Sequence, residues 1–431
     1  MKYKAYKNYK SSNINYLPKL PNEWNIMNMK YLISNIQTGS TPSTKNEDYF
    51  NGNIQWFTPG DFTEQFLIES NKKITETAIK DNEAKLLRRG TVCIVGIGAT
   101  LGKVAILKNE SSFNQQITGI NVNKKLNNRY LYYWLLDNKE RINKIANYTT
   151  LPIINNEFLK NLKVFVPSVE EQEKIVEFLD KKTSEINELI EEKETLIKLL
   201  KEKREAIITE AVTKGLDKNV KMKDSGVEWI GVIPEEWKCI KIKYIFDIVK
   251  NIAGKTGFNI LSVTQRGIKI KDISKNDGQI SMDYSKYQIV HIGDFIMNHM
   301  DLLTGWVDCS KYLGVTSPDY RVFRIKDDKK FSREYYKYIM QLCYSTKIFY
   351  GLGQGVSNLG RWRLQTDKFK EFKVPVPSKK EQYEIVNFIE NRCKYIDYIC
   401  ENIIKEIAFL EEYKESVISE VVTGKIDVRS Y

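Results

Sequence analysis

The chain has 431 residues, 42% of them hydrophobic, so it is long enough for two or three domains and too apolar to be a disordered tail. Its net charge is +12, which favours a polyanionic partner, either nucleic acid or an anionic membrane surface. The six cysteines form no Cys-x-x-Cys pair and only two histidines are present, so we expect reduced thiols and no zinc site. No run of about 18 apolar residues occurs, and Met1–Lys7 has no apolar core behind its charges, so neither a membrane span nor a secretory leader is expected.

The first globular segment is expected to contain short strands joined by a tight turn. Strands are predicted at Thr91–Val95 and Lys103–Leu107, with the Gly-rich turn Gly96–Gly102 between them. The turn is not a phosphate-binding loop, because Ile97 stands where such a loop has its first glycine and Val104 where it has the magnesium-binding hydroxyl.

Several polar groups of this segment are candidates for contact with a polyanion. Thr38–Thr44 is a small, polar loop that can approach a backbone closely, Arg88 precedes the Gly-rich turn, and Lys103 ends it. Asn114–Gln116 supplies amides, the groups that bond an adenine edge in pairs. Arg129–Leu136 follows and is predicted to be a buried helix.

The first long segment is predicted to be one helix of about 44 residues, about 65 Å long. It starts after Pro167 with Ser168 and Glu171 in capping-box spacing, and no Pro or Gly follows before Gly215. Apolar residues recur at intervals of seven or fourteen, which builds a stripe that a partner helix has to cover. The stripe consists of Leu179, Ile186, Leu200 and Ile207, and it is interrupted by Lys193 and Lys203.

The second globular segment is expected to contain the same kinds of elements. Strands are predicted at Asp294–Met297 and Arg321–Ile325, and a helix at Arg333–Met340 matches the helix of the first segment. Gly351–Gly355 lacks the strand–helix context of a dinucleotide fingerprint, so a loop is expected there. The polar candidates of this segment are Asn298, His299, Tyr320, Arg321, Arg361, Trp362 and Arg363.

The second long segment repeats the first at an offset of 210 residues. Residues 167–217 and 377–427 align without a gap with 18 identities in 51 positions, which indicates a duplication. An echo at an offset of 213 pairs Trp24 with Trp237, and both are expected in the core, as is Trp134. The second apolar stripe consists of Ile389, Ile396, Ile403, Leu410 and Val417. The duplication favours two helices that pack antiparallel with pseudo-two-fold symmetry; a long helix folded onto its own domain is the alternative.

Charge is segregated along the chain. Residues 170–213 and 380–423 each carry a net −5, so with +12 for the whole chain the remainder carries +22. The acidic excess fits the solvated faces of long helices. The basic excess makes the two globular segments the candidates for phosphate contact.

Together these features resemble the specificity subunit of type I restriction-modification enzymes, over nearly the whole chain. The most specific motif is the run of Pro-Ser, Glu-Gln and Ile-Val in Val164–Val176 and again in Val374–Val386. Gly39–Ser43, Ile54–Trp56 and Ser317–Tyr320 are also similar to that family.

The resemblance implies a mixed α/β (α+β) fold with two globular target-recognition domains separated by two long antiparallel coiled-coil helices. The expected boundaries are 1–166 and 217–376 for the recognition domains and 167–216 and 377–431 for the helical regions. It also implies a non-catalytic chain of the prokaryotic cytosol that binds double-stranded DNA, each domain reading one half of a split site. Two methylation subunits and, through the complex, restriction subunits are the implied partners. S-adenosylmethionine and ATP are expected on those partners, and neither metal nor cofactor on this chain.

DNA contacts are expected from loops of both globular segments. The candidates are Gly39, Ser40, Thr41, Ser43, Arg88, Gly98, Thr100, Lys103, Asn114, Gln115, Gln116, Asn298, His299, Tyr320, Arg321, Arg361, Trp362 and Arg363. Two other classes of protein stay open. A single-chain methyltransferase or nuclease would need a cofactor domain, for which no spare segment of about 200 residues is left. A coiled-coil scaffold would leave the two divergent basic segments unexplained.

Overall fold

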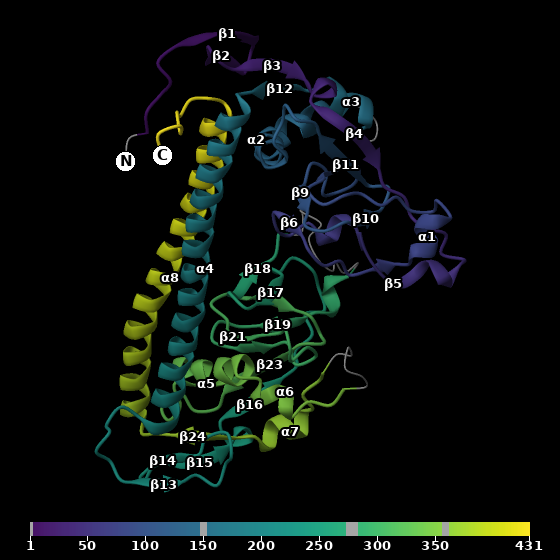
Figure 1. Ribbon diagram of the computed structural model, residues 1–431. Helices are drawn as coiled ribbons and strands as arrows, with labels where there is room; N and C mark the ends of the chain where they lie inside the picture. The colour runs from purple at the N-terminus through teal and green to yellow at the C-terminus, as the bar shows by residue number, and fades with distance from the viewer. Residues whose placement is uncertain (1–2, 147–152, 273–282, 356–361) are drawn as a thin grey trace. The chain divides into compact units, whose positions relative to one another are not determined.

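The structure is a computed structural model that describes residues 3–146, 153–272, 283–355 and 362–431 (Figure 1). The chain divides into two compact units, one formed by residues 1–193 with 405–431 and the other by residues 194–404. Each long helix therefore contributes one part to each unit. Within the described ranges, none of the helices combines the length and the apolarity needed to cross a bilayer.

The first unit is built on a five-stranded sheet with the order β4-β11-β8-β9-β6. Its strands are β4 (Ile33–Thr38), β6 (Phe66–Leu67), β8 (Val92–Val95), β9 (Val104–Leu107) and β11 (Ile117–Val122). The other elements are β1 (Tyr9–Ile14), β2 (Leu17–Pro21), β3 (Asn25–Asn28), β5 (Phe50–Phe57), β7 (Lys73–Ile74), α1 (Glu76–Lys80), β10 (Ser112–Phe113), α2 (Asn128–Ala146), α3 (Asn156–Asn161) and β12 (Lys163–Val166).

The sheet of the first unit is apolar on both faces. Along β8, Val92 and Ile94 belong to the core that includes Trp134 of α2, whereas Cys93 and Val95 belong to a second core on the other face. This alternation follows from the two-residue period of a strand. The two predicted strands, the turn between them and the buried helix are confirmed.

The second unit repeats this plan with a four-stranded sheet of the order β16-β23-β20-β21. Its strands are β16 (Phe246–Val249), β20 (Phe295–Met297), β21 (Val307–Cys309) and β23 (Arg321–Ile325). The other elements are β13 (Met222–Asp224), β14 (Val232–Pro234), β15 (Lys238–Lys241), β17 (Leu261–Thr264), β18 (Gly267–Ile270), β19 (Gln288–Val290), β22 (Gly314–Thr316), α5 (Arg333–Ser345), α6 (Ile348–Gly351), α7 (Thr366–Glu371) and β24 (Lys373–Val376). Phe295 and Phe323 pack with α5, and Ile296 and Val322 face a separate core. The duplication detected in the helices therefore extends to the sheets.

The two long helices, α4 (Val169–Lys214) and α8 (Lys379–Val422), run antiparallel in each unit (Figure 1). In the first unit, the Lys414 Nζ donates to the Asn187 Oδ1 at 3.0 Å, and Lys193 forms an ion pair with Glu406. In the second unit, the Arg204 Nε lies 3.1 Å from the Asp397 Oδ1. From Asn187 to Lys193 to Arg204, residue numbers rise along α4 while those of the contacted residues on α8 fall from 414 to 406 to 397, so the two helices are antiparallel.

The structure places the apolar stripes on the facing sides of the two helices. Buried stripe residues are Leu179, Ile186, Ile389, Ile396, Ile403 and Val417, and half-buried ones are Leu200, Ile207 and Leu410. Of the two interrupting lysines, Lys193 is half-buried in the seam beside Glu406, whereas Lys203 is exposed.

The start of each long helix is joined to its globular part by a hydrogen bond between a tryptophan and a glutamate. A glycine packs against each tryptophan, Gly424 against Trp24 and Gly215 against Trp237. The Glu171 carboxylate accepts hydrogen bonds from the Tyr6 hydroxyl at 2.6 Å and the Trp24 Nε1 at 3.1 Å. In the second unit, the Trp237 Nε1 donates to the Glu381 carboxylate at 3.0 Å. Trp24, Trp134 and Trp237 are fully buried, as predicted.

We expect Gly424→Ala to lower the free energy of unfolding by about 2–4 kcal/mol. Gly424 has a φ of +71°, and a Cβ there would lie 2.5 Å from a Pro21 ring carbon and 3.4 Å from the Trp24 ring. The left-handed backbone costs a non-glycine residue about 1–2 kcal/mol, and the overlap adds about 1–3 kcal/mol. Gly226→Ala is the matched control, because Gly226 has a φ of +65° with nothing within 4 Å of its Cβ position. Calorimetric unfolding measures both variants, and equal losses would contradict the role of the Pro21–Trp24 contact.

Candidate nucleic-acid interface

Three loops of the first unit leave the central sheet at the same end. Strand β11 is antiparallel to β4 and β8, with Thr118 opposite Thr38 and Ile117 opposite Val95. The start of β11 therefore lies beside the ends of β4 and β8. We call the loops Gly39–Ser43, Gly96–Lys103 and Asn114–Gln116 the sheet-end loops of the first unit.

Backbone hydrogen bonds hold these loops to one another. The Gly39 N–H donates to the Ile117 carbonyl at 3.0 Å, the Ser40 N–H to the Phe113 carbonyl at 3.0 Å, and the Gly96 N–H to the Gln116 carbonyl at 2.7 Å. A Cβ on Gly39 would lie 2.2 Å from the Phe113 carbonyl oxygen. Only glycine lets the first loop approach the third this closely.

The side chains of these loops differ in exposure. Exposed residues are Thr41, Ser43, Gly98 and Gln115; half-buried ones are Gly39, Ser40, Thr100, Lys103 and Gln116. Asn114 is buried, and its amide donates to the Gln116 Oε1 at 3.0 Å. The Thr41 hydroxyl donates to the Gln115 Oε1, so both exposed groups already face each other.

Two basic candidates of the first unit are engaged with the protein itself. The Lys103 ammonium donates to the Phe62 carbonyl at 3.2 Å. Arg88 is exposed, but its guanidinium donates to the Asn121 Oδ1 at 3.0 Å, near the far end of β11. Arg88 therefore lies at the opposite end of the sheet from the three loops.

The second unit has a corresponding sheet end, where β20 ends at Met297 and β23 begins at Arg321. The segment after β20 is bonded to the segment before α7. The Leu364 N–H donates to the His299 carbonyl at 3.0 Å, and the Leu302 N–H donates to the Trp362 carbonyl at 3.2 Å.

Arg321 is buried inside the second unit. Its side chain donates to the Leu364 carbonyl at 2.9 Å and lies over the Phe369 ring at 4.6 Å from the centroid. Burial lowers the pKa of this guanidinium to about 10. These contacts indicate that Arg321 supports the segment before α7 from inside the unit.

His299 is also buried, and its Nδ1 has no hydrogen-bond partner among the described residues. Burial, together with the positive charges of Arg321 and Arg363, lowers the pKa of this imidazole to about 4. The ring is therefore neutral at pH 7.

The remaining candidates of the second unit lie nearer the surface. Arg363 is exposed and Asn298, Tyr320 and Trp362 are half-buried. The Tyr344 hydroxyl donates to the Asn298 carbonyl at 2.7 Å, which fixes that loop on α5. Arg361 lies outside the described residues.

A polar contact at the first sheet end was missed by sequence reasoning. The Thr38 hydroxyl lies 3.1 Å from the Thr118 hydroxyl and donates to the Asn156 Oδ1 at 3.2 Å, which ties α3 to the sheet end. These residues are far apart in sequence, and only the strand register brings them together.

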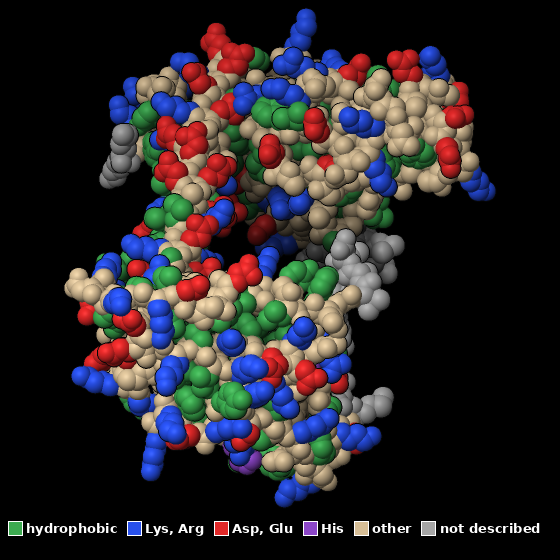
Figure 2. Space-filling model, turned by 90° about the horizontal axis from the view of Figure 1, so that it is seen from below, with side chains coloured by type: hydrophobic (Ala, Val, Ile, Leu, Met, Phe, Trp, Pro, Cys, Tyr) green, Lys and Arg blue, Asp and Glu red, His purple; other side chains and the backbone are tan. Residues whose placement is uncertain are grey.

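Charge and potential metal ligands complete the description of the surface. On the face shown in Figure 2, Lys and Arg side chains are distributed among Asp and Glu side chains and do not gather in one patch. Among the residues that the structure describes, no group of three or more His, Cys, Asp or Glu could hold a metal ion.

The chain is similar to known proteins in sequence and in fold. The family described as "Type I restriction modification DNA specificity domain" matches residues 21–199 and 234–408. The type I restriction enzyme MjaIX specificity subunit of Methanocaldococcus jannaschii is 34% identical over 181 residues, which are 41% of this chain and 40% of that relative. The MjaVIII specificity subunit of the same organism is 23% identical over 429 residues, 96% of this chain and 95% of that relative.

Two solved structures share the fold. A chain solved in work on the structural basis of complex assembly and conformational transition of the type I R-M system has a TM-score of 0.68 at 12% identity, and the match covers 94% of this chain and 99% of that one. The HsdS subunit from Thermoanaerobacter tengcongensis has a TM-score of 0.50 at 13% identity, covering 94% and 98%.

The chain belongs to the family of type I restriction-modification DNA specificity subunits. The predicted family and the predicted fold class are confirmed, and the role of the chain is DNA recognition within a type I restriction-modification complex.

The lowered pKa of His299 makes the stability of the second unit depend on pH. In an unfolded chain this imidazole has a pKa of about 6.5. As the pH is lowered from 6.5 to about 4, the unfolded state gains a proton that the folded state does not. The free energy of unfolding therefore decreases as the pH is lowered through that window, and His299 does not affect it above pH 6.5. The accumulated loss is about 3 kcal/mol. Urea unfolding of the wild type and His299→Gln at several pH values measures the difference, and His291→Gln removes the other, exposed histidine as a control. Identical pH profiles for wild type and His299→Gln would contradict the assignment.

Proposed function

We propose that each globular part reads one half of a split DNA site, and that the paired helices set the distance between the halves. Reading is assigned to residues 1–166 and 217–376, and spacing to 167–216 and 377–431. The observation that supports this division is the corresponding sheet order in the two units, β4-β11-β8-β9 and β16-β23-β20-β21, with different loops at the sheet ends. Two equivalent sheets that carry different loops suit two domains that bind DNA in the same way but recognise different base sequences.

The exposed loop groups are the proposed base and backbone contacts. The Gln115 amide can bond an adenine edge in the major groove, and the Arg363 guanidinium can bond a guanine edge or a phosphate. Thr41 and Gly98 would lie close to the sugar-phosphate backbone because they are small and exposed. The buried His299 and Arg321 are assigned to support and not to contact.

Catalysis is assigned to partner subunits, and this chain has a non-catalytic role in the prokaryotic cytosol. The helices would dock two methylation subunits, which carry S-adenosylmethionine and direct adenine methylation, and restriction subunits would join through them. Exposed apolar side chains on both helices support such docking, because faces of this kind in water mark interaction sites. They are Leu189, Leu196 and Leu199 on α4 and Tyr395, Tyr398 and Phe409 on α8.

Genome-wide adenine methylation tests the proposed function. Cells that carry this chain with its cognate methylation subunit are compared with cells that lack only this chain. We expect a split motif, two short defined halves around a fixed unread gap, only when the chain is present. Methylation that persists without the chain would instead favour an enzyme elsewhere, and a chain that binds no DNA would favour a scaffold.

The spacing role predicts the effect of lengthening the helices. Seven residues inserted in both 183–204 of α4 and 393–414 of α8 keep the seven-residue stripe and add about 10 Å. At about 3.4 Å per base pair this lengthens the unread gap by up to about 3 base pairs. The same insertion in α8 alone is the control, because it breaks the register of the pair and should abolish recognition. An unchanged gap in the double insertion would rule out the spacing role.

A further inference from the structure

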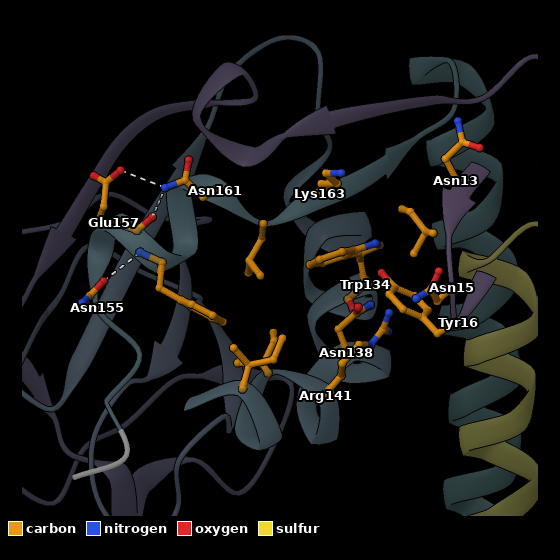
Figure 3. A pocket seen from close by; sticks show the side chains of 15 residues that line it. Asn13, Asn15, Tyr16, Trp134, Asn138, Arg141, Asn155, Glu157, Asn161 and Lys163 are labelled. Carbon is orange, nitrogen blue, oxygen red and sulfur yellow. Dashed lines mark hydrogen bonds between the residues drawn. The ribbon is translucent and has the colours of Figure 1, made fainter. Parts of the chain in front are cut away.

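The first unit contains a groove of about 840 Å³ that is lined by none of the residues of the sheet-end loops. Its walls come from the β1–β2 hairpin, α2, α3 and the start of β12. Figure 3 shows Trp134, Asn138 and Arg141 of α2 on one side, and Glu157 and Asn161 of α3 with its N-cap residue Asn155 on the other. Apolar side chains, among them Ile142, Phe158 and Leu162, complete the walls.

Two hydrogen-bond donors in this groove are unsatisfied. The Trp134 Nε1 and the Arg141 Nη1 have no partner among the described residues, and Trp134 is 1% exposed. The Arg141 guanidinium lies over the Tyr16 ring, 3.2 Å from its centroid. Buried polar groups in folded proteins are nearly always paired, so two unpaired donors call for an acceptor from outside.

The second unit fills the equivalent position with its own side chain. At the offset of 213 that pairs Trp24 with Trp237, Tyr16 corresponds to Trp229. At the offset of 210, Leu162 and Lys163 correspond to Phe372 and Lys373. The Trp229 ring stacks on Phe372 with centroids 5.4 Å apart and planes 10° apart, and its Nε1 donates to the Lys373 carbonyl at 3.2 Å.

Among the described residues of the first unit, no aromatic ring stacks over Leu162 in this way. Tyr16 is 49% exposed and turns toward Phe165, with ring centroids 6.4 Å apart, beneath Arg141. Arg141 belongs to the part of α2 that α5 lacks, since α2 has 19 residues and α5 has 13. The two repeats therefore differ at this position. The second unit fills it with the Trp229 ring, which we call the tryptophan plug, whereas the first unit has the unpaired donors of Trp134 and Arg141.

We propose that this groove binds an aromatic side chain with a neighbouring carboxylate from the methylation subunit, in the place that Trp229 takes in the second unit. The aromatic ring would lie on Leu162 and Phe158, and the carboxylate would accept from Arg141. The asparagine amides can pair with the peptide groups of the incoming segment. A DNA duplex suits the groove less well, because its bases are stacked on one another and do not present a single ring that could enter the groove. The choice of partner rests on the proposed function, whereas the ligand chemistry rests on the groove alone.

The ligand chemistry is tested on the purified full chain with N-acetyl-L-tryptophan, which carries an indole and a carboxylate. Saturation-transfer NMR is expected to show binding to the wild type in the millimolar range. Binding should weaken at least five-fold in Arg141→Gln and in the double variant Tyr16→Trp/Leu162→Phe, which copies the plug of the second unit. N-acetyl-L-tryptophanamide, which lacks the carboxylate, should bind more weakly than the acid. Unchanged binding in both variants, or equal binding of N-acetyl-L-leucine, would overturn the proposal.

The partner is tested by association of the full chain with the cognate methylation subunit. The Tyr16→Trp/Leu162→Phe variant should bind that subunit at least ten-fold more weakly, with its melting temperature and DNA affinity retained. Trp229→Tyr/Phe372→Leu, the reciprocal change in the second unit, is the matched control and should not cause this loss. Undiminished association of the plugged variant would overturn the choice of partner. If the wild type bound no methylation subunit at all, the proposed function would fail, and the probe experiment would still decide the ligand chemistry.

Discussion

The rest of the structure depends on the hydrogen bonds of a buried glutamine at the start of each long helix, which join the helix to the globular part. Gln172 is fully buried; its Oε1 accepts from the Asn127 N–H at 2.7 Å and its amide donates to the Pro167 carbonyl at 3.0 Å. Gln382 makes the same bonds to the Ser332 N–H and the Pro377 carbonyl, at 2.7 and 3.1 Å. A buried amide left unpaired costs about 1–3 kcal/mol, so the helix can start at only one place relative to the globular part. The direction of each helix is thereby fixed to the sheet that carries the loops.

This junction separates the constant part of the molecule from the variable part. The helix start, the Trp–Glu contact and the order of four antiparallel strands are alike in both units, whereas the loops at the sheet ends differ in length and composition. Loops on a rigid sheet can change without loss of the core, because their side chains contribute little to it. Gly39 is a loop position that the sheet does constrain, because a side chain there would collide with the Phe113 carbonyl.

The two copies differ most at surface positions, which belong neither to the core nor to the junction between sheet and helix. Tyr16 and Trp229 occupy equivalent positions with different roles, one beneath Arg141 and the other stacked on Phe372. On the helices, the exposed Tyr395 and Tyr398 stand at positions where the first copy has Glu185 and Glu188. A chain that presents two similar but unequal surfaces can distinguish two partners or two DNA halves, whereas an exactly repeated chain could not.

The sequence by itself determined the elements and their duplication. The stripe of seven-residue spacing, the Ser–Glu starts and the glycines after each helix predicted α4 and α8, and short apolar runs predicted β8, β9 and α2, because these features depend on neighbours a few residues away. Only the tertiary structure decided which candidates share a surface. Register between β4, β8 and β11 brings Gly39, Gly96 and Gln116 together and sends Arg88 to the other end of the sheet. The sequence did not show the burial of Arg321 and His299, since an arginine at the start of a strand or a histidine in a loop has the same local pattern whether it faces water or the protein interior.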